Sequence, residues 1–245
     1  MTGAGAQDGT SGVSSEKNFS LKKAAFTLAE VLITLGIIGV VAAMTLPSII
    51  TDYQKKVTIK KLRTTYNILN NAIEMAKTEY GTDVNYWDMP DTNDQQILSN
   101  YFAEHYMLPY LKVVRDCKNG SICRFYGYST VREFVLSNGT IVLVNVSGVG
   151  KNVQNVRTQI YIYINGKVNN INYARDKFLV ELGGGTGNSG LDKNKFWPYG
   201  YMALANCDVY KNIDNTACNK TSTNKYRCFA LIMCEGWKIP PDYPW

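Results

Sequence analysis

Residues that commonly carry catalysis are scarce in this 245-residue chain. It contains one histidine, His105, and no G-x-S-x-G sequence, so nothing indicates a histidine-dependent nucleophile or a nucleophile elbow. The glycine-rich stretch at 183–190 lacks the lysine of a phosphate-binding loop and is interpreted as a linker. These absences argue against an enzyme, and we expect none.

Acidic residues are not grouped as a metal site requires. Calcium takes six to eight oxygen ligands, and the chain has no D-x-D-x-D-G loop. The C-terminal candidates are scattered along the sequence at Asp192, Asp208, Asp214 and Asp242. We therefore expect no cofactor and no metal, with calcium as the weaker alternative. The 26 basic and 20 acidic residues leave a net charge of +6 that is spread along the chain, so no specific nucleic-acid partner is expected.

Cysteine is absent from the first 116 residues. All six cysteines lie downstream of the apolar segment, at Cys117, Cys123, Cys207, Cys218, Cys228 and Cys234. A zinc site usually draws on closer pairs or on histidine, whereas the short spacings here have five residues between the sulfurs. The even number instead predicts disulfides in an oxidising compartment. Six cysteines allow fifteen pairings. Proximity alone favours 117 with 123, 207 with 218, and 228 with 234.

Charge is absent from residues 31–51, which continue an apolar run that begins at Phe26. About 25 helical residues, rising about 1.5 Å each, can cross a hydrocarbon core about 30 Å thick. Lys22 and Lys23 precede the run, and the positive-inside bias places the C-terminal bulk outside the cytoplasm. The small residues Ala42 and Ala43 leave a cleaved signal peptide as one alternative, and a plain anchor is another. Neither explains Glu30, because a carboxylate in lipid is costly and usually functional.

The segment Lys22, Lys23, Ala25 and then Phe26-Thr-Leu-Ala-Glu30 resembles the N-terminus of the type IV pilin and pseudopilin superfamily. Members have a basic leader, a small residue, FTLxE and an apolar helix. Pro47 also falls where many members have a proline, and it should weaken or kink the helix. The residue before the cleavage point is usually glycine, and here it is Ala25, from which we expect slower processing.

The resemblance implies a mechanism. A prepilin peptidase would cut between Ala25 and Phe26, and the freed amine of Phe26 would be methylated. Glu30 would become tolerable in the membrane by pairing with the Phe26 amine of a neighbouring subunit. Implied partners are the peptidase, other pilin or pseudopilin subunits, the inner-membrane assembly platform and the lipid bilayer. The implied location is the bacterial inner membrane, crossed once with the head outside the cytoplasm, and then a pilus or pseudopilus.

The predicted fold is α+β and pilin-like: a long N-terminal hydrophobic helix packed on an antiparallel β-sheet, with a disulfide-rich C-terminal region. Apolar residues from Val57 to Ala76 recur every three or four positions, and Gly81 should end this helix. Residues 95–112 predict a helix up to Pro109. Asn138-Gly139 and Asn165-Gly166 predict hairpin turns, and 178–182 a further strand. The expected parts are a leader at 1–25, an assembly helix at 26–50, its amphipathic continuation at 51–81 and a head at 82–245.

Two further features remain open. The basic run Lys55, Lys56, Lys60, Lys61 and Arg63 is interpreted as a solvated collar that faces lipid headgroups. The chain also resembles a subset of pseudopilin-like proteins with an N-G-K turn at 165–167, Asp176-x-Phe178 and an ending near GWKIPxDYPW, here 236–245. That tail is expected to dock structurally, with an adhesive surface as the alternative. For the whole chain, the alternative function is an adhesive or DNA-binding minor pilin at a fibre tip.

Overall fold

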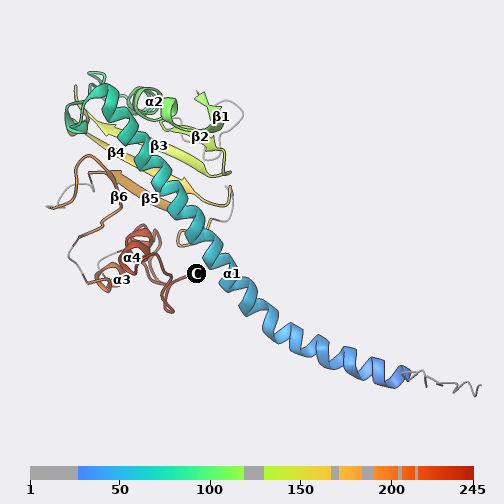
Figure 1. Ribbon diagram of the computed structural model, residues 1–245. Coiled ribbons are helices and arrows are strands. Elements are labelled where there is room, and N and C mark those ends of the chain that lie inside the picture. Colours follow the sequence, from blue (N-terminus) through green and yellow to red (C-terminus); the bar gives the residue numbers. More distant parts are fainter. Residues whose placement is uncertain (1–26, 119–129, 167–170, 184–189, 204–205, 213–214) are drawn as a thin grey trace, which may run out of the picture. The chain divides into compact units, whose positions relative to one another are not determined.

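The computed structural model describes residues 27–118, 130–166, 171–183, 190–203, 206–212 and 215–245. The chain divides into two units, Met1–Ile49 and Ile50–Trp245. One helix, α1 (Leu28–Tyr80), contributes to both and is continuous in secondary structure through Pro47. The second unit contains a six-stranded sheet and three further α-helices (Figure 1). This is the predicted α+β, pilin-like fold.

The second-unit part of α1 packs through one stripe on the sheet core. Leu62, Leu69, Ile73 and Ala76 are almost fully buried at the predicted three- and four-residue spacing. Val57, predicted for the same stripe, is 44% exposed and lies off it. Polar Thr58, Thr65 and Asn70 are buried on this stripe instead. The helix ends where predicted: Gly81 has φ +98° and its amide donates to the Lys77 carbonyl.

The sheet is an antiparallel meander whose strands follow chain order from β1 to β6. The strands are β1 (Val113–Cys117), β2 (Arg132–Leu136), β3 (Ile141–Gly148), β4 (Val156–Tyr163), β5 (Lys177–Leu182) and β6 (Phe196–Pro198). The hairpin between β2 and β3 turns at Asn138-Gly139, as predicted, with Gly139 at φ +75°. Strand β5 confirms the strand predicted at 178–182. The edge strands β1 and β6 were not predicted.

Alternation along β4 separates the two faces of the sheet. Ile160 and Ile162 belong to the core that α1 shares, whereas Tyr161 and Tyr163 join a smaller cluster on the other face. There the ammonium of Lys177 lies 4.5 Å from the ring centre of Tyr161 and 4.9 Å from that of Tyr173. Burial lowers the pKa of Lys177 to about 8. The tyrosine rings therefore offer the ammonium a partial replacement for water.

Helix α2 (Gln95–Tyr106) covers part of the core through Leu98, Phe102 and Tyr106. The Asp94 carboxylate caps its start by accepting from the amides of Gln96 and Ile97. The predicted helix at 95–112 is therefore correct in type but stops at Tyr106, and a 3-10 turn at Leu108–Tyr110 contains Pro109. Pro109 has no amide hydrogen to donate to the carbonyl four residues earlier, and its ring clashes with that carbonyl, so the α-helix cannot continue through it.

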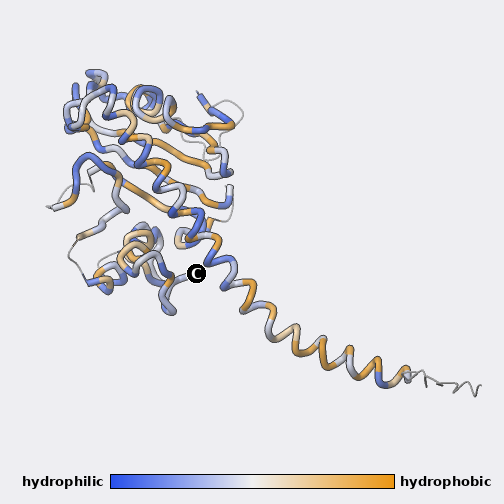
Figure 2. The backbone as a smooth tube through the Cα atoms, viewed as in Figure 1, coloured by the Kyte–Doolittle hydropathy of each residue, from blue (hydrophilic) through white to orange (hydrophobic). Residues whose placement is uncertain are grey.

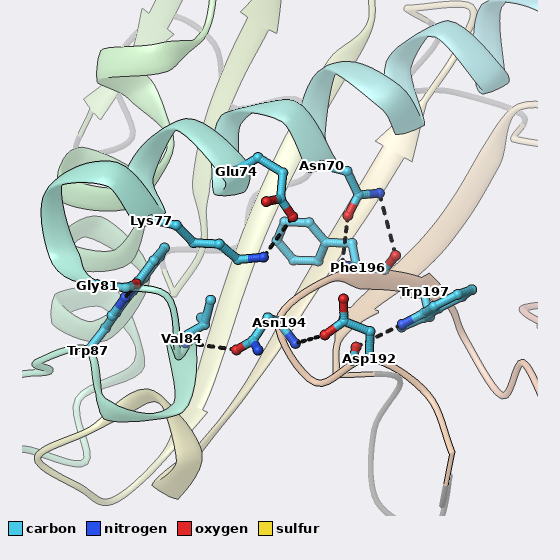
Figure 3. A network of polar contacts seen from close by, with 10 residues as sticks. All are labelled: Asn70, Glu74, Lys77, Gly81, Val84, Trp87, Asp192, Asn194, Phe196 and Trp197. Carbon is cyan, nitrogen blue, oxygen red and sulfur yellow. Dashed lines mark hydrogen bonds and ion pairs between the residues drawn. The ribbon is translucent and has the colours of Figure 1, made fainter.

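A buried asparagine joins the short edge strand β6 to α1 (Figure 3). The Asn70 side chain accepts from the Phe196 amide at 2.8 Å and donates toward the Phe196 carbonyl at 3.4 Å. The Tyr66 hydroxyl donates to the same carbonyl at 2.8 Å. Burial raises the pKa of Tyr66 to about 12, which keeps this donor protonated. Nearby, the Val84 amide donates to Asn194 at 2.8 Å. Side chains of α1 thus satisfy backbone groups that the sheet leaves unpaired at its edge.

Replacing Asn70 by Ala should lower the free energy of unfolding by about 1 to 3 kcal/mol, because it leaves the buried Phe196 amide without a partner. Thermal unfolding of the full chain in detergent measures the loss. Asn67→Ala is the matched control, since Asn67 is exposed on the same helix one turn earlier. It should change stability by less than about 0.5 kcal/mol. Equal effects of the two substitutions would contradict the proposed role of Asn70.

The C-terminal region holds two short helices and two disulfides, and the two pairings predicted there from proximity, 207 with 218 and 228 with 234, are wrong. Cys207 pairs with Cys234, and Cys218 with Cys228. The reason is that Cys228 and Cys234 are the two ends of α4 (Cys228–Cys234). Six residues of helix separate their Cα atoms by about 9 Å, beyond the roughly 7 Å that a disulfide spans. Helix α3 (Val209–Asn212) directly follows the Cys207 region. Cys117 is also disulfide-bonded, and Cys123 lies outside the described residues.

Candidate functional site

The N-terminal end of α1 is closed by a reciprocal pair of hydrogen bonds. The Thr27 amide donates to Glu30 Oε2 at 2.9 Å, and the Glu30 amide donates to Thr27 Oγ1 at 3.2 Å. This is a capping box, which satisfies two of the amides that a helix start leaves unpaired. Its T-x-x-E signature is present in the sequence at residues 27–30, although the capping box was not predicted. Glu30 therefore has a local structural partner besides any role in assembly.

The capping box also orients the acid. It holds the Glu30 carboxylate against the amide of Thr27, the residue that precedes α1. Thr27 remains an amide-linked residue if the chain is cut before Phe26, so the cap is compatible with processing. The processing residues Ala25 and Phe26, with Lys22 and Lys23, lie outside the described residues.

The first-unit part of α1 presents an apolar surface. Its large side chains are exposed, including Leu28, Leu32, Ile38 and Met44. The hydropathy colouring of Figure 2 shows that this part of the helix is mostly apolar. Within the described residues, α1 is a single helix long and apolar enough to cross a membrane, judged by its length and composition. Its hydroxyl groups bond the helix itself at 2.9–3.0 Å, from Thr34 to Val31, Thr45 to Val41 and Ser48 to Thr45. Such back-bonding makes them compatible with a lipid environment.

A basic stretch of α1 follows directly. Lys56, Lys60 and Arg63 are exposed, as expected for the predicted collar, and Lys55 is half-buried. Lys61 differs, because burial lowers the pKa of its ammonium. The Arg63 guanidinium lies over the ring of Trp237 at 5.4 Å, so the C-terminal tail reaches this part of the helix.

The tail is docked by a helix cap. The Gly236 amide donates to Met233 and the Trp237 amide donates to Ile232, which together form a Schellman motif after α4. Gly236 has φ +66° and Trp237 has φ +65°, a strained conformation for an aromatic residue. The Trp237 ring is held against Tyr66 and Phe229, each with ring centres 5.8 Å from its own. This packing is the structural docking predicted for the tail.

The other residues of the family-like tail and turn also meet. Asn165 donates to Asp176 at 2.7 Å, and Arg175 lies 3.1 Å from the same carboxylate. Burial opposes ionisation of Asp176, but Arg175 and Asn165 outweigh it and lower its pKa. The Tyr243 hydroxyl donates to the Ala174 carbonyl. Asp176 is the buried centre of the contacts around this turn, whereas Asn165 is exposed, and Lys167 lies outside the described residues.

The acids considered for a metal serve other purposes. Asp208 and Asp242 both pair with Lys211, at 3.0 and 2.9 Å. Asp192 accepts from the Asn194 amide, and Asp214 lies outside the described residues, as do residues 184–189 of the glycine-rich stretch. Over the part of the chain that the structure describes, no three His, Cys, Asp or Glu side chains group as metal ligands would. His105 Nδ1 lies 2.9 Å from the Tyr101 carbonyl and its ring stacks on that tyrosine.

Comparison with known families matches residues 48–245 to a family of unknown function, DUF6613. The chain belongs to the DUF6613 family. Residues 20–46 match the prokaryotic N-terminal methylation motif. With the long apolar helix, this match makes the DUF6613 protein a type IV pilin-like or pseudopilin subunit, a class whose members are generally structural. No curated protein and no solved structure matches the chain.

Proposed function

We propose that the DUF6613 protein is a non-enzymatic structural subunit of a type IV pilus or a type II secretion pseudopilus. The observation that carries the proposal is an acid, Glu30, at the start of an exposed apolar helix, next to the N-terminal methylation motif. A buried carboxylate requires a compensating cation. The Phe26 amine released by a prepilin peptidase in a neighbouring subunit supplies one at the right level of the helix.

The capping box gives this pairing a geometric basis. It uses Oε2 of Glu30 as the acceptor for the Thr27 amide. One carboxylate can accept several hydrogen bonds, so the cap and an intersubunit cation can share it. The cap fixes the direction of the acid, and the cation then sets the axial register of the incoming subunit on the assembly platform.

Membrane insertion precedes assembly. Lys22 and Lys23 stay on the cytoplasmic side, residues 26–50 cross the inner membrane, and the head lies outside. The C-terminal disulfides suit that oxidising side of the membrane. The proposed partners are therefore the lipid bilayer, the prepilin peptidase that cleaves the chain and methylates Phe26, and the assembly platform.

A DNA-binding or adhesive tip subunit is the second candidate, and clustering of basic residues on one face would favour it. Basic side chains do cluster, at Lys55, Lys56, Lys60 and Arg63. They follow the apolar stretch by five to thirteen residues of helix, however, and so lie close to the membrane along the chain. That location fits a lipid-facing role better than the exposed end of a fibre.

Processing gives the direct test. In cells with an active prepilin peptidase, the mature chain should begin at Phe26 with a methylated amine, as read by N-terminal mass spectrometry. Ala25→Gly should be processed faster, because glycine is the usual residue at that position in the superfamily. Cleavage after Ala43, or an intact leader in such cells, would refute the proposal.

A further inference from the structure

A groove lies between the membrane-proximal part of α1 and the C-terminal tail. Its volume is about 740 Å³. Residues of α1 from Asp52 to Asn67 form one wall, and residues 236–239 of the tail form the other. Both walls belong to the second unit and meet where the Arg63 guanidinium lies over the Trp237 ring. The groove is therefore a preformed feature of the head.

The groove carries an excess of positive charge. Its basic residues are Lys55, Lys56, Lys60, Arg63 and Lys238, and its one acid is Asp52. Asp52 lies 3.9 Å from Lys55. Over the described residues, none of the other four basic side chains has an acidic partner. Cations gathered in a concave, partly apolar site raise the local concentration of anions.

The groove also has an apolar floor. Ile59, Trp237 and Ile239 line it beside the charges. The Arg63 guanidinium lies over the Trp237 ring, and a guanidinium binds phosphate oxygens in pairs through its N–H groups. An aromatic ring beside cations suits the interface between lipid headgroups and acyl chains.

Chain length places the groove near the membrane. Lys55 and Lys56 follow Ile50, the end of the apolar stretch, by five and six residues of continuous helix. At about 1.5 Å per residue these are contour distances of about 8 and 9 Å. The headgroup layer on each side is about 5 to 8 Å thick, and a lysine side chain reaches several Å further. Arg63 follows Ile50 by thirteen residues, a contour distance of about 20 Å. A phosphate bound by Arg63 would therefore belong to a headgroup drawn out of the headgroup layer into the groove.

We propose that this groove binds the phosphate of an anionic phospholipid headgroup. The phosphate would lie between Arg63 and Lys238, with Lys56 and Lys60 at the mouth and Trp237 beneath it. Bound lipid would tie the head to the membrane surface before assembly. The proposal rests on the proposed membrane insertion and goes beyond the predicted solvated collar, because it assigns a walled site that includes the tail.

Native mass spectrometry of the full-length protein in non-ionic detergent tests the site. The probe is palmitoyl-oleoyl phosphatidylglycerol, compared with phosphatidylcholine carrying the same chains. We expect a bound phosphatidylglycerol that Arg63→Gln with Lys238→Gln weakens by about 25-fold, since each basic residue near an anionic surface contributes about fivefold. Lys56→Gln with Lys60→Gln, a second exposed pair, should weaken it similarly.

The control pair Lys112→Gln with Lys193→Gln removes the same charge from exposed positions outside the groove and should leave binding within about twofold. Equal affinity of wild-type protein for the two lipids, or equal behaviour of the groove and control pairs, would overturn the proposal. Displacement by excess inorganic phosphate would assign a site for free anions instead. Tighter binding of a short DNA duplex would assign nucleic acid.

Failure of this proposal differs from failure of the proposed function. Lipid binding is measured on purified chain, whereas fibre assembly is read from cleavage at Phe26 and from recovery in sheared fibres. A groove variant that loses lipid but is still cleaved and assembled supports both proposals. A wild-type chain that binds lipid but is never cleaved would contradict only the proposed function.

Discussion

Replacing Glu30 by Gln is expected to leave the protein in the membrane with a folded head but absent from fibres. Gln can serve in a capping box as Glu does, so the bonds with Thr27 should persist. What the substitution removes is the negative charge. The Phe26 amine of a neighbouring subunit would then be buried without a counter-ion, at a cost of about 3 to 5 kcal/mol. That cost predicts that incorporation of the variant into fibres falls by about a hundredfold or more.

Two companion variants separate charge from capping. Thr27→Ala keeps the charge but removes the hydroxyl that accepts from the Glu30 amide, and should cost about 0.5 to 2 kcal/mol of helix stability. It should therefore be incorporated, at a reduced level. Glu30→Ala removes both the charge and the oxygen that accepts from the Thr27 amide, and should resemble Glu30→Gln in fibres while showing more fraying at the start of α1.

The measurement is the ratio of subunit in sheared fibres to subunit in membranes, determined by immunoblot for each variant. Cleavage at Phe26 is checked in parallel so that a processing defect is not mistaken for an assembly defect. If Glu30→Gln were incorporated like wild type while Thr27→Ala failed, the acid would act as a helix cap and the charge-pairing mechanism would be wrong.

Sequence periodicity predicted the elements that bury long apolar stripes. Leu62, Leu69 and Ile73 recur at helical spacing, and Ile160 and Ile162 alternate along a strand, so local pattern and tertiary burial agree. Gly139 likewise marks its hairpin because the turn requires φ above zero.

Elements that depend on distant partners could not be predicted in this way. Strand β6 has three residues, includes Pro198 and is held by Asn70, which lies 126 positions away from Phe196. Helix α4 is seven residues long, too short for its apolar run to be distinguished from a strand by pattern alone. That ambiguity also misdirected the disulfide pairing, since pairing neighbours is reasonable only if the segment between them turns back.

The groove could be predicted only in part from the sequence, for the same reason. Its basic helix residues were evident in the sequence, and their interpretation as a headgroup-facing collar needed no fold. Lys238 and Trp237 are more than 170 positions away from that stretch, and only the docking of the tail by Gly236 places them beside it. The capping box was different, because T-x-x-E was readable in the sequence and its chemistry is local.

Loss of the Cys207–Cys234 disulfide is expected to destabilise the head more than loss of the Cys218–Cys228 disulfide. The longer bond closes 27 residues and the shorter one 10. Loop-closure entropy of the unfolded chain gives about 3.6 and 2.7 kcal/mol, respectively. For a chain of this size the first value corresponds to a fall in Tm of about 7 to 14 °C.

The head should nevertheless stay folded without the longer bond. Phe229, Leu231 and Ile232 of α4 are fully buried in the core, and their burial is independent of the cysteines. The paired variant Cys207→Ser with Cys234→Ser therefore tests the cross-link itself. Its Tm in non-reducing buffer is compared with that of Cys218→Ser with Cys228→Ser and with that of reduced wild-type protein.

Single substitutions test which cysteines are paired. In the Cys207→Ser variant, Cys234 should be the thiol that alkylation labels, while Cys218 and Cys228 stay linked. Pairing by proximity would instead release Cys218. Peptide mapping of the alkylated chain distinguishes the two results. A labelled Cys218 would show that α4 does not separate its terminal sulfurs in the native protein. It would also contradict the helix cap after α4 that brings Trp237 to Arg63.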